Sequence, residues 1–350
     1  MVSISSFNEF DKSDMLGIML DFPNQCRIAK EIGERFKPSK KIMKPKLILW
    51  CGMGGSAIGG DVIASYLKDK INVSIIRNRH YDIPTYVDKD TLVLISSYSG
   101  NTEETRSCYA QAKSKRSTIL MMTSGGKLAE AAVKNGDMLI VIPQGLPPRC
   151  ALGYSSIPII MAFSKLGLIG SCANEIDETI ALLRKLKDRL SPMASKSSNI
   201  SLKLAEQLYG KFPLIYASID HFEPVAYRWR TQIEENAKSL ASHHIFAEMN
   251  HNEIEGFEPF SKVSKDIVAL YLRDKGDHPR IKRRMAIIKD IIKGKKVKLL
   301  EVNSMGESVL ARIFSTIYIG DWVSLYLAVM NKVDPTPVHR IAYLKRRLGE

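Results

Sequence analysis

The stretch Trp50 to Asp61, WCGMGGSAIGGD, decides the fold, because it joins an apolar run to a glycine-rich turn and a helix start. The apolar run is Leu47 to Leu49, and Ser56 stands within the turn. A strand that leads through small residues into a helix points backbone N–H groups at one spot, where the helix dipole adds positive potential. The stretch therefore predicts an anion-binding loop.

A second stretch, Ser96 to Glu104 (SSYSGNTEE), repeats this arrangement after another apolar run. Its hydroxyls, on Ser97, Ser99 and Thr102, suit a terminal monophosphate beside a helix N-terminus. Residues of these types also cap helices and form turns without binding anything, which is the alternative for either loop alone. Two such loops in one domain predict a phosphate held from two sides.

Strands and helices alternate around these loops. The predicted strands are Leu47–Cys51, Val73–Arg77, Leu92–Ser96, Thr118–Met122 and Met138–Val141, with helices that start near Ser56, Glu103 and Lys127. Such alternation predicts a parallel sheet with helices on both faces, and ligands bind at the carboxyl ends of its strands. Both loops lie at that edge. Earlier in the chain, helical segments are predicted from Met15 to Phe36, interrupted at Pro23.

The second half of the chain repeats the alternation. The predicted elements are helices Ser201–Tyr209, Glu223 to about Ser242, Arg280–Ile292 and one from Glu307, with strands Pro213–Ala217, Ile267–Leu272 and Val297–Val302. The counterpart of the first glycine loop reads YASIDHFEP and lacks a glycine cluster. We therefore expect an α/β protein of two doubly wound domains, each a parallel sheet flanked by helices. The phosphate loops lie in the first domain, residues 1–170, and the second covers 195–350.

Composition narrows the class of protein. The chain has five cysteines at scattered spacings and no CxxC pair, which predicts a reducing compartment and argues against a zinc site or a disulfide framework. The N-terminus lacks an apolar core of signal-peptide length, so we expect a cytoplasmic protein. The apolar stretch Val309 to Met330 carries Arg312 and Asp321, which favours a buried helix over a membrane span.

The net charge of +14 raises the possibility of a nucleic-acid partner. The excess comes from short lysine and arginine runs that are not interleaved with aromatic residues, as a base-stacking surface would be. A solvated basic surface is the better interpretation, and we expect neither nucleic acid nor membrane as a partner. Part of the positive field can attract an anionic substrate.

The first loop also fits a loose GxGxxA dinucleotide fingerprint from Gly52 to Ala57. That fingerprint needs an acidic residue at the end of the next strand to hold the ribose, and Ile75 to Asn78 offers none. Arg77 could instead meet a 2′-phosphate. An NADP-dependent oxidoreductase therefore stays as an alternative.

A candidate proton-transfer site lies in the second half. Glu235 falls nearly opposite the apolar face of its predicted helix, where most carboxylates are simply solvated. The following segment, SHHIFAEMNHNEIEGF, holds His243, His244 and His251 without HExxH spacing, which argues against a zinc site. A carboxylate with an imidazole is the usual acid–base pair near neutral pH. No role follows for His243 and His244.

Three further residues stand in rigid or charged contexts. Arg149 follows two prolines and can either stabilise a developing oxyanion or hold a linker by salt bridges. Thr336 stands on a turn between two prolines. Lys345 lies on the last predicted helix, where a basic residue also caps the helix favourably.

Together these motifs resemble those of the bifunctional phosphoglucose/phosphomannose isomerases, which are built from two sugar-isomerase (SIS) domains. The shared motifs occur in order from Cys51 to Lys345 as CGMGGSAIGGD, SYSGNTEET, PPR, EENAK, EMNHNEIEG and DPTPV followed by LK. The early loops alone would indicate only a phosphosugar binder. A phosphosugar-binding SIS protein without turnover is thus the second alternative.

The resemblance implies an aldose–ketose isomerase that acts on glucose 6-phosphate and mannose 6-phosphate without metal or cofactor. By motif match, the phosphate would be bound by Gly54, Gly55, Ser56, Ser97, Ser99 and Thr102.

The later motifs imply the catalytic roles. Glu235 would move the proton between C1 and C2, and Arg149 would stabilise the cis-enediolate. His251 and Lys345 would assist ring opening, while Thr336 would leave room for both epimers. The resemblance further implies a homodimer in which His251 reaches the site from the other subunit.

Overall fold

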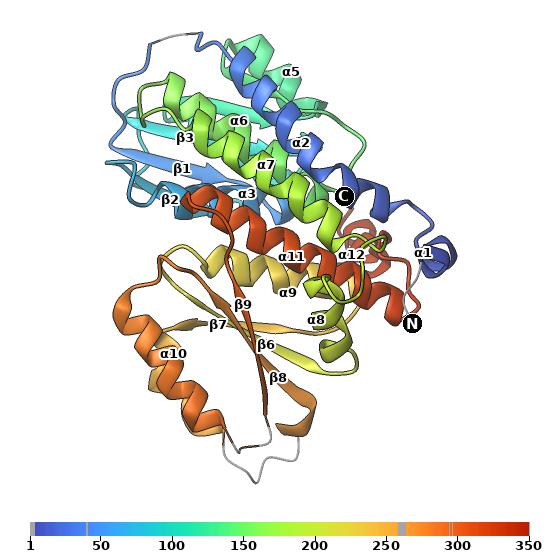
Figure 1. Ribbon diagram of the computed structural model, residues 1–350. Coiled ribbons are helices and arrows are strands. Elements are labelled where there is room, and N and C mark those ends of the chain that lie inside the picture. Colours follow the sequence, from blue (N-terminus) through green and yellow to red (C-terminus); the bar gives the residue numbers. More distant parts are fainter. Residues whose placement is uncertain (1–3, 40, 258–263, 294, 296, 350) are drawn as a thin grey trace. The chain divides into compact units, whose positions relative to one another are not determined.

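Two separate parallel sheets organise the chain in the computed structural model, which describes residues 4–39, 41–257, 264–293, 295 and 297–349 (Figure 1). The chain divides into two compact units around these sheets. We call residues 22–177 the N-unit, and residues 1–21 with 178–348 the C-unit. The predicted α/β class, with two parallel sheets flanked by helices, is confirmed.

The N-unit contains a five-stranded sheet in the order β2-β1-β3-β4-β5, with all neighbours parallel. The strands are β1 (Leu47–Cys51), β2 (Ser74–Asn78), β3 (Thr91–Ser97), β4 (Thr118–Thr123) and β5 (Met138–Val141). All five were predicted, with ends that differ by no more than one residue. The sheet grows from β1 outward to β2 on one side and through β3 on the other, so the strand order reverses between β1 and β3. The carboxyl edge of these two strands is the topological switch point, where ligands bind in such sheets.

Helices cover both faces of this sheet, because its central strands carry apolar residues on both faces. The helices of the N-unit are α3 (Gly54–Leu67), α4 (Glu103–Ser114), α5 (Gly126–Asn135) and α6 (Leu152–Lys165), with α2 (Met15–Arg35) from Phe22 on. Most of α7 (Ala173–Leu190) belongs to the C-unit, because the N-unit ends at Asp177. One face carries a core of β1, β3 and β4 residues that includes Cys108 of α4 and Leu128 of α5. On the other face Gly60 of α3 lies flat on Trp50, where a Cβ would come 2.5 Å from the indole.

The predicted interruption of the first helix is wrong. α2 runs through Pro23 without a break. A proline inside a helix removes one backbone N–H and crowds the preceding turn. It can bend the helix without ending it when the residues around it are held by packing. Phe22 and Cys26 are both buried, and their packing accounts for the continuous helix.

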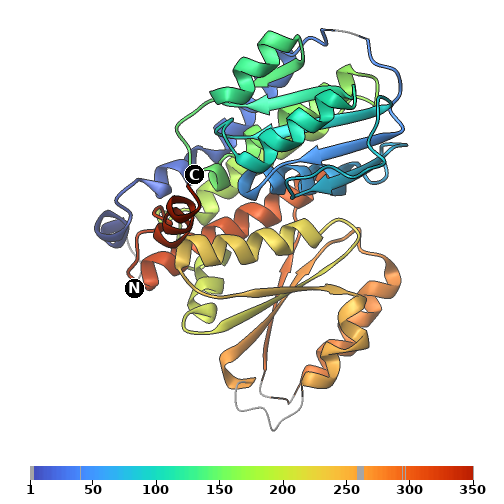
Figure 2. The same ribbon diagram turned by 180° about the vertical axis from the view of Figure 1, so that it is seen from behind.

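The C-unit contains a four-stranded parallel sheet in the order β7-β6-β8-β9. Its strands are β6 (Phe212–Ser218), β7 (Ser242–Phe246), β8 (Ile267–Arg273) and β9 (Lys298–Asn303). Its helices are α1 (Ile4–Phe10), α8 (Ile200–Leu208), α9 (Glu223–Ala237), α10 (Pro279–Ile292), α11 (Val309–Met330) and α12 (His339–Leu348). Figures 1 and 2 show α10 on one face of this sheet and α9 with α11 on the other.

One strand of this sheet escaped the sequence analysis. The predicted helix from Glu223 to about Ser242 is too long, because α9 ends at Ala237 and Lys238 turns into the left-handed region at φ 57°. The residues Ser242 to Phe246 then form the edge strand β7. Its sequence, SHHIF, mixes polar and apolar residues without alternation, so the strand was not recognisable from pattern.

The long helix α11 is the core helix of the C-unit. Its composition would suit a membrane span, yet 94% of its most apolar window is buried, as predicted for a buried helix. The Trp229 indole N–H donates to the Thr316 carbonyl at 2.9 Å, and Gly320 lets that ring lie against the helix backbone. Tyr318 donates to the Met19 carbonyl at 2.7 Å, which ties the start of the chain to this unit.

Candidate active site

The two glycine-rich loops of the N-unit meet at the carboxyl edge of its sheet. The Ser56 hydroxyl, in the first turn of α3, accepts the N–H of Tyr98 at 3.0 Å. Gly52 lies so close to the end of β3 that a Cβ would approach the Ser96 carbonyl to 3.1 Å. A side chain at Gly52 would therefore crowd the end of β3, because the two loops pack closely against each other.

The second loop arranges its hydroxyls around the start of α4. Ser97 and Thr102 hydroxyls are 3.0 Å apart, and the Ser99 hydroxyl accepts the N–H of Asn101 at 3.3 Å. Ser97 is buried and Ser99 exposed, so the loop reaches from the sheet edge to the surface.

A third loop, Ser124 to Gly126 after β4, was not singled out from the sequence. The Ser124 hydroxyl donates to the Tyr98 carbonyl at 2.6 Å, which braces the second loop. Gly100 packs on it so tightly that a Cβ would come 1.8 Å from the Gly125 carbonyl oxygen. The sequence does show this loop, as the glycine-rich run SGG one residue after the predicted strand Thr118–Met122.

Arg149 lies beside the first loop. It belongs to the short 3-10 helix η1 (Pro148–Cys150) and is 7% exposed. A Cβ on Gly55 would come 2.5 Å from the Pro148 carbonyl and 2.9 Å from the Arg149 nitrogen, so the two segments are in backbone contact. Gln25, itself buried, fixes η1 by donating to the Cys150 carbonyl at 2.9 Å.

The N-unit thus brings together all seven of its predicted site residues at one sheet edge. The starts of α3 and α4 direct positive helix ends to that edge, and hydroxyls and an arginine accompany them. This chemistry suits an oxygen-rich anion.

The corresponding edge of the C-unit sheet is acidic. Asp274 follows β8, where it accepts from Arg312 at 2.8 Å, and Asp277 accepts the Asp274 N–H at 2.9 Å. Asp220, after β6, accepts the N–H of His278 at 3.0 Å. Burial, with the nearby carboxylates of Asp274 and Asp220, raises the pKa of Asp277 to about 6. These carboxyl groups disfavour a phosphate, and Arg312, the cation beside them, is already paired with Asp274.

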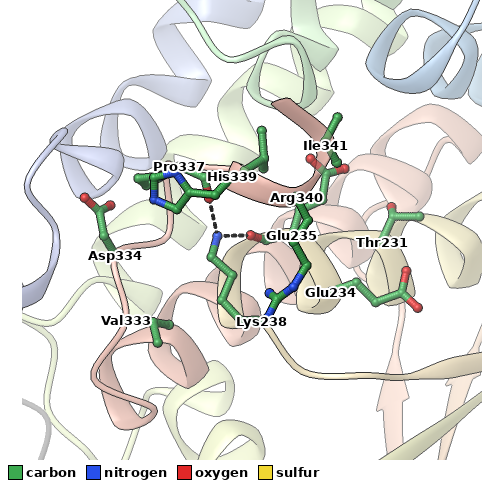
Figure 3. A pocket seen from close by; sticks show the side chains of 11 residues that line it. Thr231, Glu234, Glu235, Lys238, Val333, Asp334, Pro337, His339, Arg340 and Ile341 are labelled. Carbon is green, nitrogen blue, oxygen red and sulfur yellow. Dashed lines mark hydrogen bonds between the residues drawn. The ribbon is translucent and has the colours of Figure 1, made fainter. Parts of the chain in front are cut away.

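Glu235 lies in the last turn of α9 and lines a cavity of about 600 Å³ within the C-unit (Figure 3). The half-buried carboxylate is thus not a plain surface group. Burial, with a smaller contribution from Glu235, raises the pKa of neighbouring Glu234. The lining residues are Thr231, Glu234, Glu235, Lys238, Val333, Asp334, Pro337, Val338, His339, Arg340 and Ile341.

The turn that carries Thr336 borders the same cavity. The Thr336 N–H donates to the Asp334 carboxylate at 2.9 Å, and Asp334 and Pro337 line the cavity on either side of it. Lys238 donates to the carbonyls of Pro335 at 3.1 Å and Pro337 at 2.7 Å. The structure therefore brings Glu235 and Thr336, a hundred residues apart, to one place.

His251 is exposed on the 3-10 helix η2 (Glu248–His251) and is not among the residues that line this cavity. Its segment is held to the sheet through Glu253, which accepts from Tyr216 at 2.6 Å and pairs with His244 Nδ1 at 2.9 Å. His244 Nε2 lies 2.8 Å from the Ser242 hydroxyl. His244, which had no role in the sequence analysis, thus anchors the segment that carries His251.

His243 has a different environment. Its ring packs edge-on against Tyr227, with centroids 5.4 Å apart, and burial lowers its pKa to about 4. The imidazole is therefore neutral near pH 7. Within the described ranges, no three His, Cys, Asp or Glu side chains are grouped closely enough to hold a metal ion.

Lys345 is exposed on α12 and does not line the cavity; the first turn of that helix does, through His339, Arg340 and Ile341. The geometry of the C-unit thus joins Glu235 with Thr336 and leaves His251 and Lys345 outside their cavity. Lys238, Asp334 and Arg340 are cavity residues that the sequence analysis did not assign.

Comparison with known proteins gives consistent relatives. Residues 197–348 match the family described as the bacterial phospho-glucose isomerase C-terminal SIS domain. A bifunctional phosphoglucose/phosphomannose isomerase from Caldicellulosiruptor bescii is 45% identical over 96% of this chain and 99% of its own length. One from Aquifex aeolicus is 35% identical over 89% of this chain and 92% of its own.

Solved structures share the fold at low sequence identity. A hypothetical protein from Thermus thermophilus superposes with a TM-score of 0.73 at 15% identity, covering 96% of this chain and 91% of that chain.

Proposed function

The chain belongs to the bifunctional phosphoglucose/phosphomannose isomerases, and we propose that it converts glucose 6-phosphate or mannose 6-phosphate to fructose 6-phosphate and back through a cis-enediol. It is an enzyme of the aldose–ketose isomerase class. The observation that carries the choice of substrates is the 45% identity to such an isomerase over 99% of that relative's length.

We assign the phosphate to the carboxyl edge of the N-unit sheet. The proposed ligands are Gly54, Gly55, Ser56, Ser97, Ser99 and Thr102. The joined loops around Ser56 and Tyr98 support this assignment, because they hold hydroxyls and two helix starts in a fixed arrangement. Contacts to a phosphate remote from C1 and C2 convert binding energy into orientation of the open-chain sugar.

Glu235 is the proposed base that removes the proton from C2 of the aldose and returns it to C1 of the ketose. That proton is weakly acidic, so the reaction also needs a cation beside the oxygen on which charge develops. Arg149 is the proposed cation, because a guanidinium stays charged and does not give up its proton.

Ring opening precedes this step, and we assign it to His251 with Lys345. Thr336 is proposed to leave room for rotation about C2–C3, which admits both epimers. We further propose a homodimer in which His251 serves the partner's site. The exposure of His251 supports that arrangement, because an exposed side chain is accessible to a second copy of the chain.

The remaining expectations stand as proposals of the same kind. Of the proposed domains 1–170 and 195–350, the second is supported by the family match over 197–348 and the first by the compact unit of residues 22–177; residues 1–21 belong to the C-unit. A cytoplasmic location is supported by five free, buried cysteines. No cofactor is needed for a proton transfer between adjacent carbons.

The test of the function is a coupled assay that follows fructose 6-phosphate formed from each aldose separately. We expect turnover of both. Binding of either sugar phosphate without turnover would favour the phosphosugar-binding alternative, and NADP-dependent absorbance change with a sugar phosphate would favour the oxidoreductase.

The role of Glu235 is tested by Glu235→Gln, which keeps the shape and removes the base. We expect kcat to fall by about 10³-fold or more while phosphate-ligand affinity stays within a few-fold. The matched control is Glu234→Gln, since both side chains line the same cavity and are half-buried. An equal loss in the two variants, or loss of binding in Glu235→Gln, would assign Glu235 to structure.

Metal removal is a separate prediction. Exhaustive chelation should leave the rate of isomerisation unchanged, because an arginine can stabilise the enediolate without a Lewis acid. Inhibition that added Mg²⁺ or Zn²⁺ reverses would contradict this mechanism.

A further inference from the structure

We propose that Lys238 is a positioning residue that fixes the Thr336 turn against the end of α9 and so sets how the enzyme divides its activity between the two epimers. The proposal rests on the functions assigned above to Glu235 and Thr336. It gives Lys238 a role of its own, which is to hold these two residues in position.

The Lys238 ammonium is bound by backbone carbonyls. It donates to the carbonyl of Glu235, and to those of Pro335 at 3.1 Å and Pro337 at 2.7 Å; Figure 3 shows the bonds to Glu235 and Pro337. An ammonium can donate up to three hydrogen bonds, and these three acceptors are all main-chain carbonyls. Lys238 therefore joins two backbone segments, the end of α9 and the turn that carries Thr336.

The backbone at Lys238 is arranged to make this contact. Lys238 ends α9 at φ 57° and ψ 31°, a conformation in which glycine is the usual residue. The last carbonyls of a helix lack partners within it, and a side chain that folds back from this position can supply one. A glycine here would end the helix equally well but could not reach the Thr336 turn.

The two backbone segments that Lys238 joins carry the two residues assigned to the reaction, Glu235 and Thr336. One acceptor is the main chain of the proposed base, Glu235. The other two flank Thr336, whose own N–H is bound to Asp334 at 2.9 Å. The turn is thus fixed from within by Asp334 and from α9 by Lys238, so the space beside Thr336 depends on both.

A second tether holds the same helix end without touching the Thr336 turn. Asn331, which caps α11, donates to the Ala237 carbonyl at 2.8 Å and lies 2.9 Å from the Ser239 hydroxyl. Removal of Asn331 loosens α9 from α11 but leaves the contact between Lys238 and the prolines. It therefore provides a matched control for general loosening.

Glucose and mannose 6-phosphates differ only in configuration at C2, so a change in the space beside Thr336 acts on them unequally. In Lys238→Met we expect kcat to fall about tenfold, KM to stay within about threefold, and the ratio of kcat/KM for the two aldoses to shift at least about threefold. Asn331→Ala should lower Tm and leave that ratio unchanged.

Restoring the ammonium should restore the kinetics. Lys238→Cys treated with 2-bromoethylamine carries an amine on a side chain of nearly the same length. Lys238 is exposed and the five natural cysteines are buried, so the reaction is selective, with treated wild type as its control. Recovery of both kcat and the epimer ratio on alkylation is a result that loss of stability alone cannot produce.

The contact of Lys238 with the Thr336 turn can also be tested by a measurement that does not depend on turnover. Amide hydrogen exchange over residues 333–341 should quicken in Lys238→Met and not in Asn331→Ala. Unchanged exchange there, or a wild-type epimer ratio in Lys238→Met, overturns the proposal. Failure of the wild type to isomerise either sugar phosphate overturns the proposed function instead. Hydrogen exchange then still tests whether Lys238 fixes the Thr336 turn.

Discussion

Asp277 is a buried carboxyl whose ionisation opposes folding. Its pKa is raised from 3.8 to about 6, so the folded state holds a proton that the unfolded chain has already lost. Stability therefore falls as pH rises from near 4 through about 6 and stays lower above that. Two pKa units correspond to about 2–3 kcal/mol.

The variant Asp277→Asn removes this penalty and keeps an oxygen for the Asp274 N–H. We expect it to raise the free energy of unfolding at pH 7.5 by about 1–3 kcal/mol and to flatten its pH dependence between 4 and 6. Urea unfolding at several pH values from 4 to 7.5 measures both effects. The exposed Asp290 on α10 supplies the control, Asp290→Asn, which should leave the profile as it is; an unchanged profile in Asp277→Asn contradicts the assignment.

The sequence predicts residues of the site where the chemistry is local. Ser56, Ser97 and Thr102 were predicted to lie at one sheet edge, and they do, because a loop and the helix it starts are adjacent in the chain. Lys238 was not assigned, because its partners are the carbonyls of prolines about a hundred positions away, and carbonyls leave no mark in a sequence. The closeness of Asp220 to Asp277 was not predicted either, because the two residues are far apart in the chain and only the fold brings them together.

Among the elements, helices α9 and α11 are joined by a buried ion pair as well as by apolar and hydrogen-bond contacts. Arg228 and Asp321 are 3% and 4% exposed at the side chain and meet at 2.8 Å, with Gln232 donating to the same carboxylate at 3.1 Å. In Asp321→Ala the guanidinium stays buried without this carboxylate. We expect a loss of about 3–5 kcal/mol in the free energy of unfolding.

The control for this prediction removes both charges. Arg228→Met with Asp321→Leu should be closer to wild type than Asp321→Ala alone, because no buried charge remains. Denaturant unfolding of the three proteins gives the comparison. A double variant that is less stable than the single one would show that the ion pair itself stabilises the helices.

Elements were predictable where their pattern is self-contained. Four of the five predicted strands of the N-unit are largely apolar runs of ordinary length, and β2, with the sequence SIIRN, was predicted from its two isoleucines and its place after the helix that starts near Ser56. β7 was missed because an edge strand needs to bury little, so SHHIF carries no periodic signal. The continuous helix through Pro23 depends on tertiary packing, which local propensity does not contain.

For the whole molecule, the proposed exchange of His251 between subunits predicts complementation. Glu235→Gln and His251→Ala should each be nearly inactive. If they are unfolded together and refolded as mixed dimers, one site in each heterodimer has both groups, so about a quarter of wild-type activity should return. Each variant refolded alone is the control, and no recovery on mixing would place both residues in one subunit's site.

The first residues of the chain belong with its last helices, through the bond from Tyr318 to Met19 and the edge contact between Phe7 and Tyr326. During synthesis on the ribosome, those residues emerge first but find their partners only after some three hundred others have followed. The N-unit, contiguous from 22 to 177, can fold in the meantime. A nascent chain stalled near residue 200 should therefore resist proteolysis within 22–177 and be cleaved in its first twenty residues, which gain protection only on release of the full chain.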